Sequence, residues 1–162
     1  MMKIIVLLLL MILPLASFGQ LVTSTAQSPA GLVQNVLLGS GVTVSNITFN
    51  GQPTAIGEFN GTNTNIGLDE GIVITTGTVL NQGNAGPHGP NNLPDSGLDN
   101  PSGGFALLSN LIGGTATFDA AVLEFDFIPY SNSVAFNYVF GSEEYPEYVG
   151  STFNDVFAFF II

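Results

Sequence analysis

The densest group of metal-binding residue types lies near the C-terminal end of the 162-residue sequence. It combines carboxylates with one amide: Glu143, Glu144, Glu147, Asn154 and Asp155. Ca²⁺ takes about six to eight oxygen ligands from carboxylates, amides and backbone carbonyls. The segment therefore predicts a Ca²⁺ site, although the EF-hand spacing D-x-[DN]-x-[DN]-G is absent. The alternative is a solvated acidic loop whose carboxylates only accept backbone hydrogen bonds.

A second group of oxygen ligands lies in a long loop over residues 81–104, in which Gly, Asn and Pro dominate. Asp95, Asp99 and Asn100 in this loop are further candidate ligands. Connections longer than about 12–15 residues are uncommon unless they are functional or disordered. The loop is therefore either a ligand- or ion-binding segment or a mobile surface loop.

Residues that could catalyse a reaction do not form a recognisable constellation. Glu124 and Asp126 could be a glycosidase pair, but neighbours on one face of any strand meet the required separation of about 5–9.5 Å. His88 is the single histidine, and no G-x-S-x-G elbow, Walker loop or dinucleotide fingerprint is present. The absence of Cys excludes thiolate zinc sites and cysteine nucleophiles. We therefore expect a protein that is not an enzyme.

The tyrosines offer another binding chemistry, which is stacking against sugar rings. They are Tyr130, Tyr138, Tyr145 and Tyr148. Tyr145 and Tyr148 flank Pro146 and Glu147, an arrangement compatible with a lectin-like site. The alternative is that these rings anchor a loop to the core by burial.

The charge of the chain narrows the classes of partner. Lys3 is the only Lys or Arg, against twelve Asp and Glu, and the net charge is −11. Without basic side chains the protein can neither release counterions from nucleic acid nor bind anionic lipid head groups. Any buried carboxylate after residue 3 must be hydrogen-bonded, protonated or bound to a cation, because no Lys or Arg can pair with it. This strengthens the expectation of a metal site.

Residues 1–19 have the organisation of a signal peptide. Lys3 precedes an apolar run over residues 4–13, and residues 17–19 place small side chains at the −3 and −1 positions of a cut before Gln20. The run is too short for a membrane-spanning helix, which needs about 20 apolar residues. The sequence predicts export, with a mature chain that begins at Gln20 and contains no transmembrane segment.

One short helix is expected near the start of the mature chain. Ser28 can cap it and Pro29 suits its first turn. Its apolar stripe consists of Leu32, Val36 and Leu37. Glycine stops it, at Gly39 or Gly41. A second helical turn is expected over residues 105–111.

Strands account for most of the remaining pattern. They are expected at residues 42–49, 71–77, 122–128, 134–140 and 155–162. The apolar segment 71–77 lies between glycines, which predicts a strand inside a sheet. In 122–128, apolar side chains alternate with Glu124 and Asp126, the pattern of a half-buried antiparallel strand. Residues 129–133 are a plausible hairpin loop between 122–128 and 134–140.

These elements predict an all-β protein, an antiparallel β-sandwich of which a jelly roll is one form, with a short N-terminal helix. Because the sequence ends within the apolar run 155–162, we expect residues 20–162 to be a C-terminally truncated β domain. Further domains and a sorting signal are expected downstream. An apolar terminal strand leaves an unpaired edge, so residues 20–162 alone are expected to aggregate.

Residues 140–160, FGSEEYPEYVGSTFNDVFAFF, resemble the signature of the choice-of-anchor L family of bacterial surface domains. The similarity extends upstream through AAVLEFDFIP at 120–129, GIVITTG at 71–77 and LVQNVLLGSGVTVSNITFNG at 32–51. The resemblance implies surface display on secreted proteins of Gram-negative bacteria, especially Bacteroidota. It also implies a C-terminal sorting signal, of which the gliding-motility or type IX secretion type is one. It implies no established activity.

The expected function is that of a non-catalytic extracellular or cell-surface module. We expect adhesion or binding of an extracellular glycan or protein ligand, with dependence on Ca²⁺. One alternative is a polysaccharide-binding accessory domain of an extracellular hydrolase. A structural spacer is the other alternative.

Overall fold

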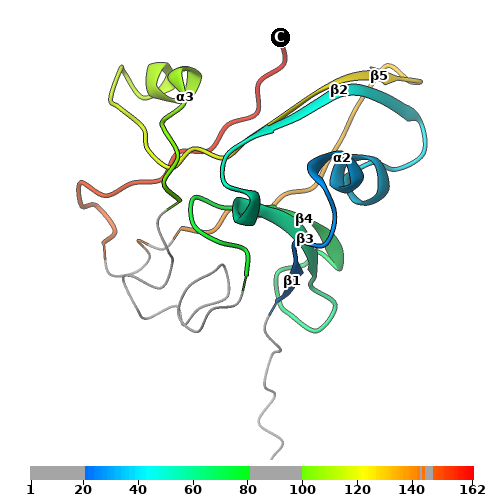
Figure 1. The fold of residues 1–162 in the computed structure, drawn as a ribbon, viewed down its shortest axis with the longest axis horizontal. Helices are drawn as coiled ribbons and strands as arrows, with labels where there is room; N and C mark the ends of the chain where they lie inside the picture. Colours follow the sequence, from blue (N-terminus) through cyan, green and yellow to red (C-terminus); the bar gives the residue numbers. More distant parts are fainter. Residues whose placement is uncertain (1–20, 81–99, 143, 145–147) are drawn as a thin grey trace, which may run out of the picture.

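The computed structural model describes residues 21–80, 100–142, 144 and 148–162 (Figure 1). The elements in this part are, in order, β1 (Val22–Ser24), α2 (Pro29–Leu32), η1 (Val33–Leu37), β2 (Val42–Asn50), η2 (Pro53–Ala55), β3 (Ile56–Asn60), β4 (Glu70–Ile74), α3 (Ala106–Leu111) and β5 (Val122–Pro129). Every strand pairing among them is antiparallel. The predicted all-β class with a short N-terminal helix is confirmed.

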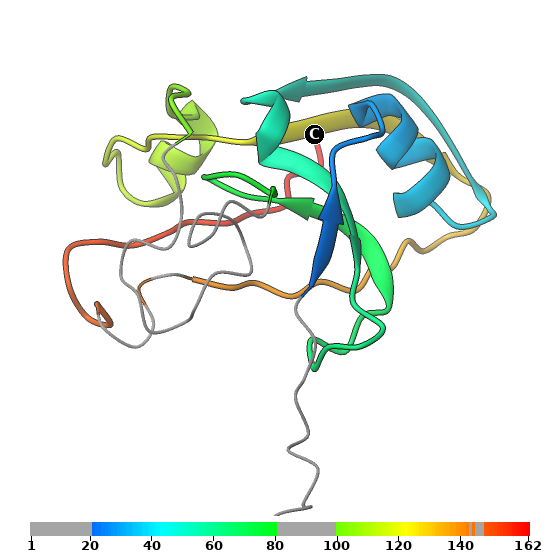
Figure 2. The ribbon, with the colours of Figure 1, turned by 60° about the horizontal axis from the view of Figure 1, so that its bottom comes forward.

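The strands form two sheets. One has the order β1-β3-β4, and the other pairs β2 with β5. Figure 2 shows β2 and β5 above β1, β3 and β4, as two layers. Strand β4, predicted to lie inside a sheet, is instead at the edge of its sheet in the described part of the chain, because β3 takes the central position.

The first helix is capped as the sequence predicts. Ser28 has an extended backbone, and its hydroxyl accepts a hydrogen bond from Gly31 N at 3.2 Å. The helix widens into a π-helical turn over η1, which closes with Leu38 N donating to Val33 O at 3.2 Å. Leu32 and Val33 are fully buried, whereas Leu37 is exposed. The apolar stripe thus includes Val33 in place of Leu37, because the wider turn rotates the buried face.

The core lies where this helix meets both sheets. Helix α2 contacts β2 and β3, and η1 contacts β4. The buried apolar residues in the described part of the chain are Leu32, Val33, Ala55, Ile56, Val79 and Ala120. The helix therefore fixes the position of the three-stranded sheet against β2.

A β-bulge sets the register of β2 against β5. Ser45 pairs with Asp126 and Thr48 pairs with Glu124, so Asn46 and Ile47 together lie opposite Phe125. Asn46 adopts φ of 52°. The extra residue changes the phase of the strand, and Ile47 therefore joins the half-buried face.

Residues 134–140 and 155–162 do not form the predicted strands within the described residues. Pro129 pairs with Val42, the first residue of β2, and Tyr130 N donates to Gly41 O at 2.9 Å, so the chain passes the end of β2 at this point. Because β5 pairs with β2, residues 129–133 do not join it to its sheet partner as a hairpin loop. The two segments nevertheless lie side by side in antiparallel order. Their rings meet as Phe136 with Phe159 at 4.2 Å, Tyr138 with Phe157 at 5.7 Å and Phe140 with Phe157 at 5.8 Å between centroids.

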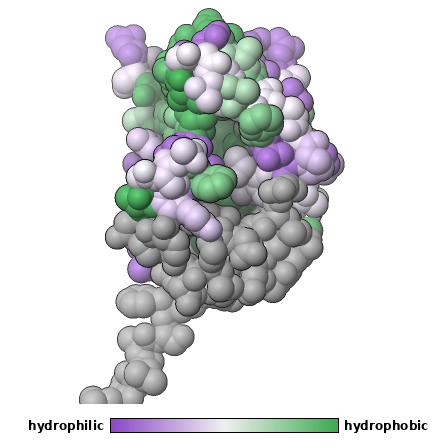
Figure 3. Space-filling view, turned by 90° about the vertical axis from the view of Figure 1, so that its left-hand side faces the viewer, coloured by the Kyte–Doolittle hydropathy of each residue, from purple (hydrophilic) through white to green (hydrophobic). Residues whose placement is uncertain are grey.

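The segment predicted as a core strand is largely exposed. Residues Phe157, Phe159 and Phe160 have exposed side chains, and Ile161 is 87% exposed. Apolar side chains are also exposed on α3, at the end of the molecule seen at the top of Figure 3: Leu107, Leu111 and the adjoining Ile112. A run of apolar residues thus did not by itself produce burial.

Candidate functional site

The predicted acidic segment turns back on itself. Tyr148 N donates to Glu144 O at 2.6 Å, and Ser151 N donates to Tyr148 O at 2.9 Å. The rings of Tyr148 and Phe153 meet edge to face, with centroids 5.4 Å apart. Because of these turns, the chain after residue 151 runs back toward Glu144, and Asp155 lies beside Glu144.

Glu144 is held by hydrogen bonds from neighbouring residues. Ser142 donates a short hydrogen bond from Oγ to Glu144 Oε2, and Glu144 N donates to Ser142 Oγ at 3.3 Å. Burial raises the pKa of the Glu144 carboxyl, but hydrogen bonds from the Ser142 hydroxyl, the Glu144 backbone N–H and the Asp155 carboxyl outweigh burial. The pKa therefore lies below its ordinary value of 4.5.

The structure brings together part of the predicted ligand set. Glu144 and Asp155 share a hydrogen bond, while Asn154 donates from Nδ2 to Ser151 O at 3.3 Å. Glu143 and Glu147 lie outside the described residues. Among the residues that are described, no three His, Asp or Glu side chains converge as metal ligands would.

The long loop contributes one described candidate. Asn100 is fully buried; its Oδ1 accepts from Ser102 Oγ at 2.9 Å, and its backbone N donates to Thr76 O at 3.0 Å. Its Nδ2 has no hydrogen-bond partner among the described residues. Asp95, Asp99 and His88 lie outside the described residues. Asn100 therefore ties the end of the loop to the chain that follows β4.

The remaining candidates are dispersed. Glu124 and Asp126 are exposed on β5, and Asp126 accepts from Asn46 Nδ2 at 2.5 Å. Tyr130 OH lies 2.7 Å from Thr43 Oγ1, Tyr138 packs among phenylalanines, and Tyr148 packs on Phe153. Tyr145 lies outside the described residues. No two of the described tyrosines form a ring pair.

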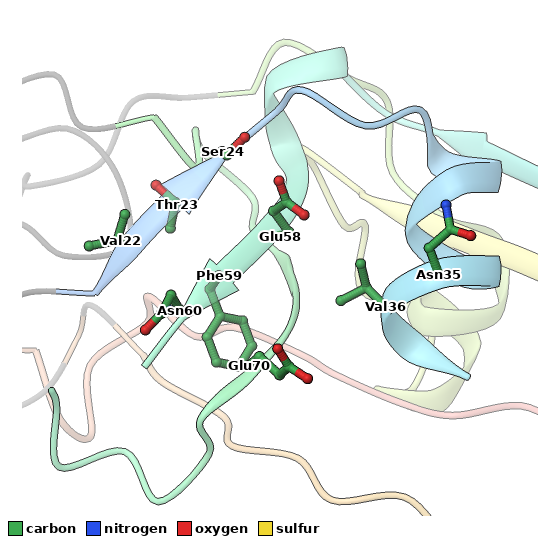
Figure 4. Close-up of a pocket in the computed structure, with 9 residues that line it drawn as sticks. All are labelled: Val22, Thr23, Ser24, Asn35, Val36, Glu58, Phe59, Asn60 and Glu70. Carbon is green, nitrogen blue, oxygen red and sulfur yellow. The ribbon is translucent and has the colours of Figure 1, made fainter. Parts of the chain in front are cut away.

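Sequence reasoning missed a hollow of about 310 Å³ between the three-stranded sheet and η1 (Figure 4). Strand register explains its lining: Ser24 pairs with Glu58, and Asn60 pairs with both Val22 and Glu70. Residues directly opposite in antiparallel strands share one face. The hollow therefore brings two carboxylates from different strands to one face, a juxtaposition that only the pairing of the strands reveals.

A chain of side-chain hydrogen bonds holds one of these carboxylates. Asn35 donates from Nδ2 to Gln27 Oε1 at 3.3 Å, and Gln27 donates from Nε2 to Glu58 Oε2 at 2.6 Å. Glu58 is half-buried and Glu70 is exposed. In Figure 4, Val36 points from η1 toward the strands that carry both glutamates. The hollow is thus both acidic and partly apolar.

Comparison with known proteins gives one family. The sequence model of the choice-of-anchor L domain family matches residues 21–162 of the chain. No curated protein and no solved structure matches the chain. The matched family is a type of non-catalytic module found on surface or secreted proteins. In the described ranges, the helices are all too short or too polar to cross a membrane.

Proposed function

Because the chain belongs to the choice-of-anchor L family, we propose that it is an exported, non-catalytic module of the outer cell surface that binds an extracellular glycan or protein ligand. The match over residues 21–162 is the observation that carries this proposal. The signal-peptide pattern of residues 1–19 supports export. Adhesion, gliding motility and type IX sorting stay predictions from the family resemblance.

The proposal includes a Ca²⁺ ion at the acidic segment, with Glu144 and Asp155 as its first ligands. Two carboxyl groups in contact repel one another when both are ionised, unless a proton or a cation lies between them. No Lys or Arg is available after residue 3 to relieve that repulsion. Asn154, Glu143 and Glu147 are the neighbours in sequence that would complete an oxygen ligand set.

Thermal unfolding in Ca²⁺ tests this part of the proposal. Extracellular modules bind Ca²⁺ with Kd of about 10⁻⁴–10⁻³ M. A ligand that binds only the folded state adds RT ln(1 + [L]/Kd) to the free energy of unfolding, which is about 1.4 kcal/mol at a tenfold excess over Kd. We therefore expect millimolar Ca²⁺ to raise Tm and EDTA to reverse the change. Glu144→Gln and Asp155→Asn should each reduce the response.

Screening is the competing explanation, since a chain of net charge −11 responds to any salt. Na⁺ at matched ionic strength is the first control. Glu124→Gln is the second, because it removes the same charge from the exposed side of β5. A shift that Na⁺ reproduces in full, or one that survives both substitutions at the acidic segment, would show that the segment is only a solvated loop.

A further inference from the structure

The hollow beside η1 has a single sign of charge. Glu58 and Glu70 come from adjacent strands and occupy diagonal positions on one face, since Glu58 pairs with Ile72 and Asn60 pairs with Glu70. Diagonal neighbours of this kind lie about 7–8 Å apart. That separation allows one cationic group to lie between the two carboxylates.

Within the described part of the chain, no basic side chain neutralises either carboxylate. Glu58 accepts one hydrogen bond, from the neutral amide of Gln27, and the described residues provide no hydrogen-bond partner for Glu70. Lys3 is the only Lys or Arg in the sequence. An acidic hollow of this kind raises the local concentration of cations.

The walls favour an organic cation over a metal ion. Val22 and Val36 line the hollow together with the polar groups of Ser24, Asn35 and Asn60. Ca²⁺ needs about six to eight oxygen ligands, whereas the two carboxylates of this hollow lie on different strands at diagonal positions with valines beside them. A Lys or Arg side chain combines an apolar stem with a charged head, so its stem can lie on valine while its head meets carboxylate.

We propose that this hollow binds a basic side chain, Lys or Arg, presented by a partner protein. Glu58, oriented through Gln27 and Asn35, and Glu70 receive the charged head, while Val36 covers the stem. The site is separate from the proposed Ca²⁺ ligands at Glu144 and Asp155. It gives the module a protein ligand of stated chemistry, and an experiment in EDTA keeps it independent of the Ca²⁺ proposal.

The test uses Nα-acetyl-arginine amide as the probe and Nα-acetyl-citrulline amide as its neutral isostere. Titration of the purified protein in EDTA is followed by ¹H–¹⁵N NMR. We expect the arginine probe to shift the backbone amides of Glu58, Asn60 and Glu70, and the citrulline probe to leave them in place. A charge-assisted hydrogen bond corresponds to about a tenfold change in affinity. Glu58→Gln and Glu70→Gln should each weaken binding by about that factor.

Glu124→Gln is the matched control, since it removes one charge from an exposed position on β5. Its affinity for the arginine probe should equal that of the unaltered protein. Equal shifts with citrulline, or an equal loss in all three variants, would mean general attraction to an acidic protein and would overturn the proposal. A neutral disaccharide or Ca²⁺ that shifts these amides where arginine does not would assign the hollow to glycan or metal instead.

Discussion

Glu144 shows how a single carboxylate is stabilised in a chain that lacks basic partners. Its pKa lies below the ordinary value, because hydrogen bonds from Ser142, its own N–H and Asp155 outweigh the effect of burial. A carboxyl whose pKa is lower in the folded state than in the unfolded state contributes stability above the unfolded value. That stability is lost as the pH falls through the folded value.

The first prediction concerns this pH dependence. At neutral pH, Glu144→Gln should be less stable than the unaltered protein, and below the folded pKa the difference should disappear. Urea unfolding at pH 7 and in acid measures this difference in the free energy of unfolding. The exposed variant Glu124→Gln removes the same charge and corrects for the repulsion that acid relieves throughout the chain. A difference between Glu144→Gln and Glu124→Gln that is unchanged in acid would contradict the assignment.

Asn46 carries the conformation that the β-bulge requires. Its φ of 52° lies in the left-handed region, which costs a residue with a Cβ roughly 1–2 kcal/mol and costs glycine little. We therefore expect Asn46→Val to lower the free energy of unfolding by about 1–2 kcal/mol relative to Asn46→Gly. Both variants lose the hydrogen bond to Asp126, so their comparison isolates the backbone. Equal stability of the two in urea would argue against the bulge.

At the scale of elements, α3 is held by one threonine. Phe105 N donates to Thr117 Oγ1 at 2.9 Å, Ser109 Oγ lies 2.9 Å from the same atom, and Thr117 N donates to Ser109 Oγ at 3.3 Å. Gly104 allows this approach, because a Cβ there would lie 1.9 Å from Thr117 O. The helix is therefore fixed to the chain that leads into β5.

This network gives a prediction for α3. Thr117→Val keeps the side-chain shape but removes the hydroxyl that accepts from Phe105 N and contacts Ser109 Oγ, and we expect a loss of about 1–3 kcal/mol in the free energy of unfolding. Chemical denaturation measures the loss. Thr115→Val is the control, because the Thr115 hydroxyl makes an exposed contact of 3.5 Å to Ile112 O. If both variants lose the same amount, the network does not hold α3.

The elements that could be predicted are those with a strong local pattern. β-Branched residues identified the strand at 42–49, alternation identified 122–128, and Ser28 with Pro29 identified the helix start. Strand β1 was missed because three residues give no alternation, and β3 because its Gly57 and Asn60 have low strand propensity. Pairing with β4 overrides that propensity. The partner of β5 was also wrong, because chain neighbours are not always neighbours in a sheet.

The candidate sites differ in the same way, because one lies within a single segment and the other is formed by two strands. Glu144 and Asp155 were predicted from a local concentration of carboxylates, and their contact is present. Glu58 and Glu70 lie on two different strands, and only the pairing of β3 with β4 brings them together. Nothing in the sequence around either residue predicts that they are neighbours. Sequence reasoning therefore finds sites within one segment and misses sites that the register of a sheet assembles.

For the whole molecule, the exposed aromatic side chains on the two antiparallel segments have a physical consequence. Phe136, Tyr138, Phe157 and Phe159 are exposed although they contact one another. Contiguous apolar patches on a protein surface promote association. We expect purified residues 20–162 to self-associate at micromolar concentration. Light scattering coupled to gel filtration measures this, and a monomer that melts cooperatively would contradict it.

The proposed function requires the module to be displayed outside the cell. Trypsin has no cleavage site after Lys3, so a glutamyl endopeptidase is the appropriate probe for intact cells. Purified protein establishes that the enzyme cleaves the folded chain, and a periplasmic marker reports leakage. We expect the chain to be cleaved on intact cells while the marker stays whole. A chain that is protected until the outer membrane is permeabilised would contradict surface display.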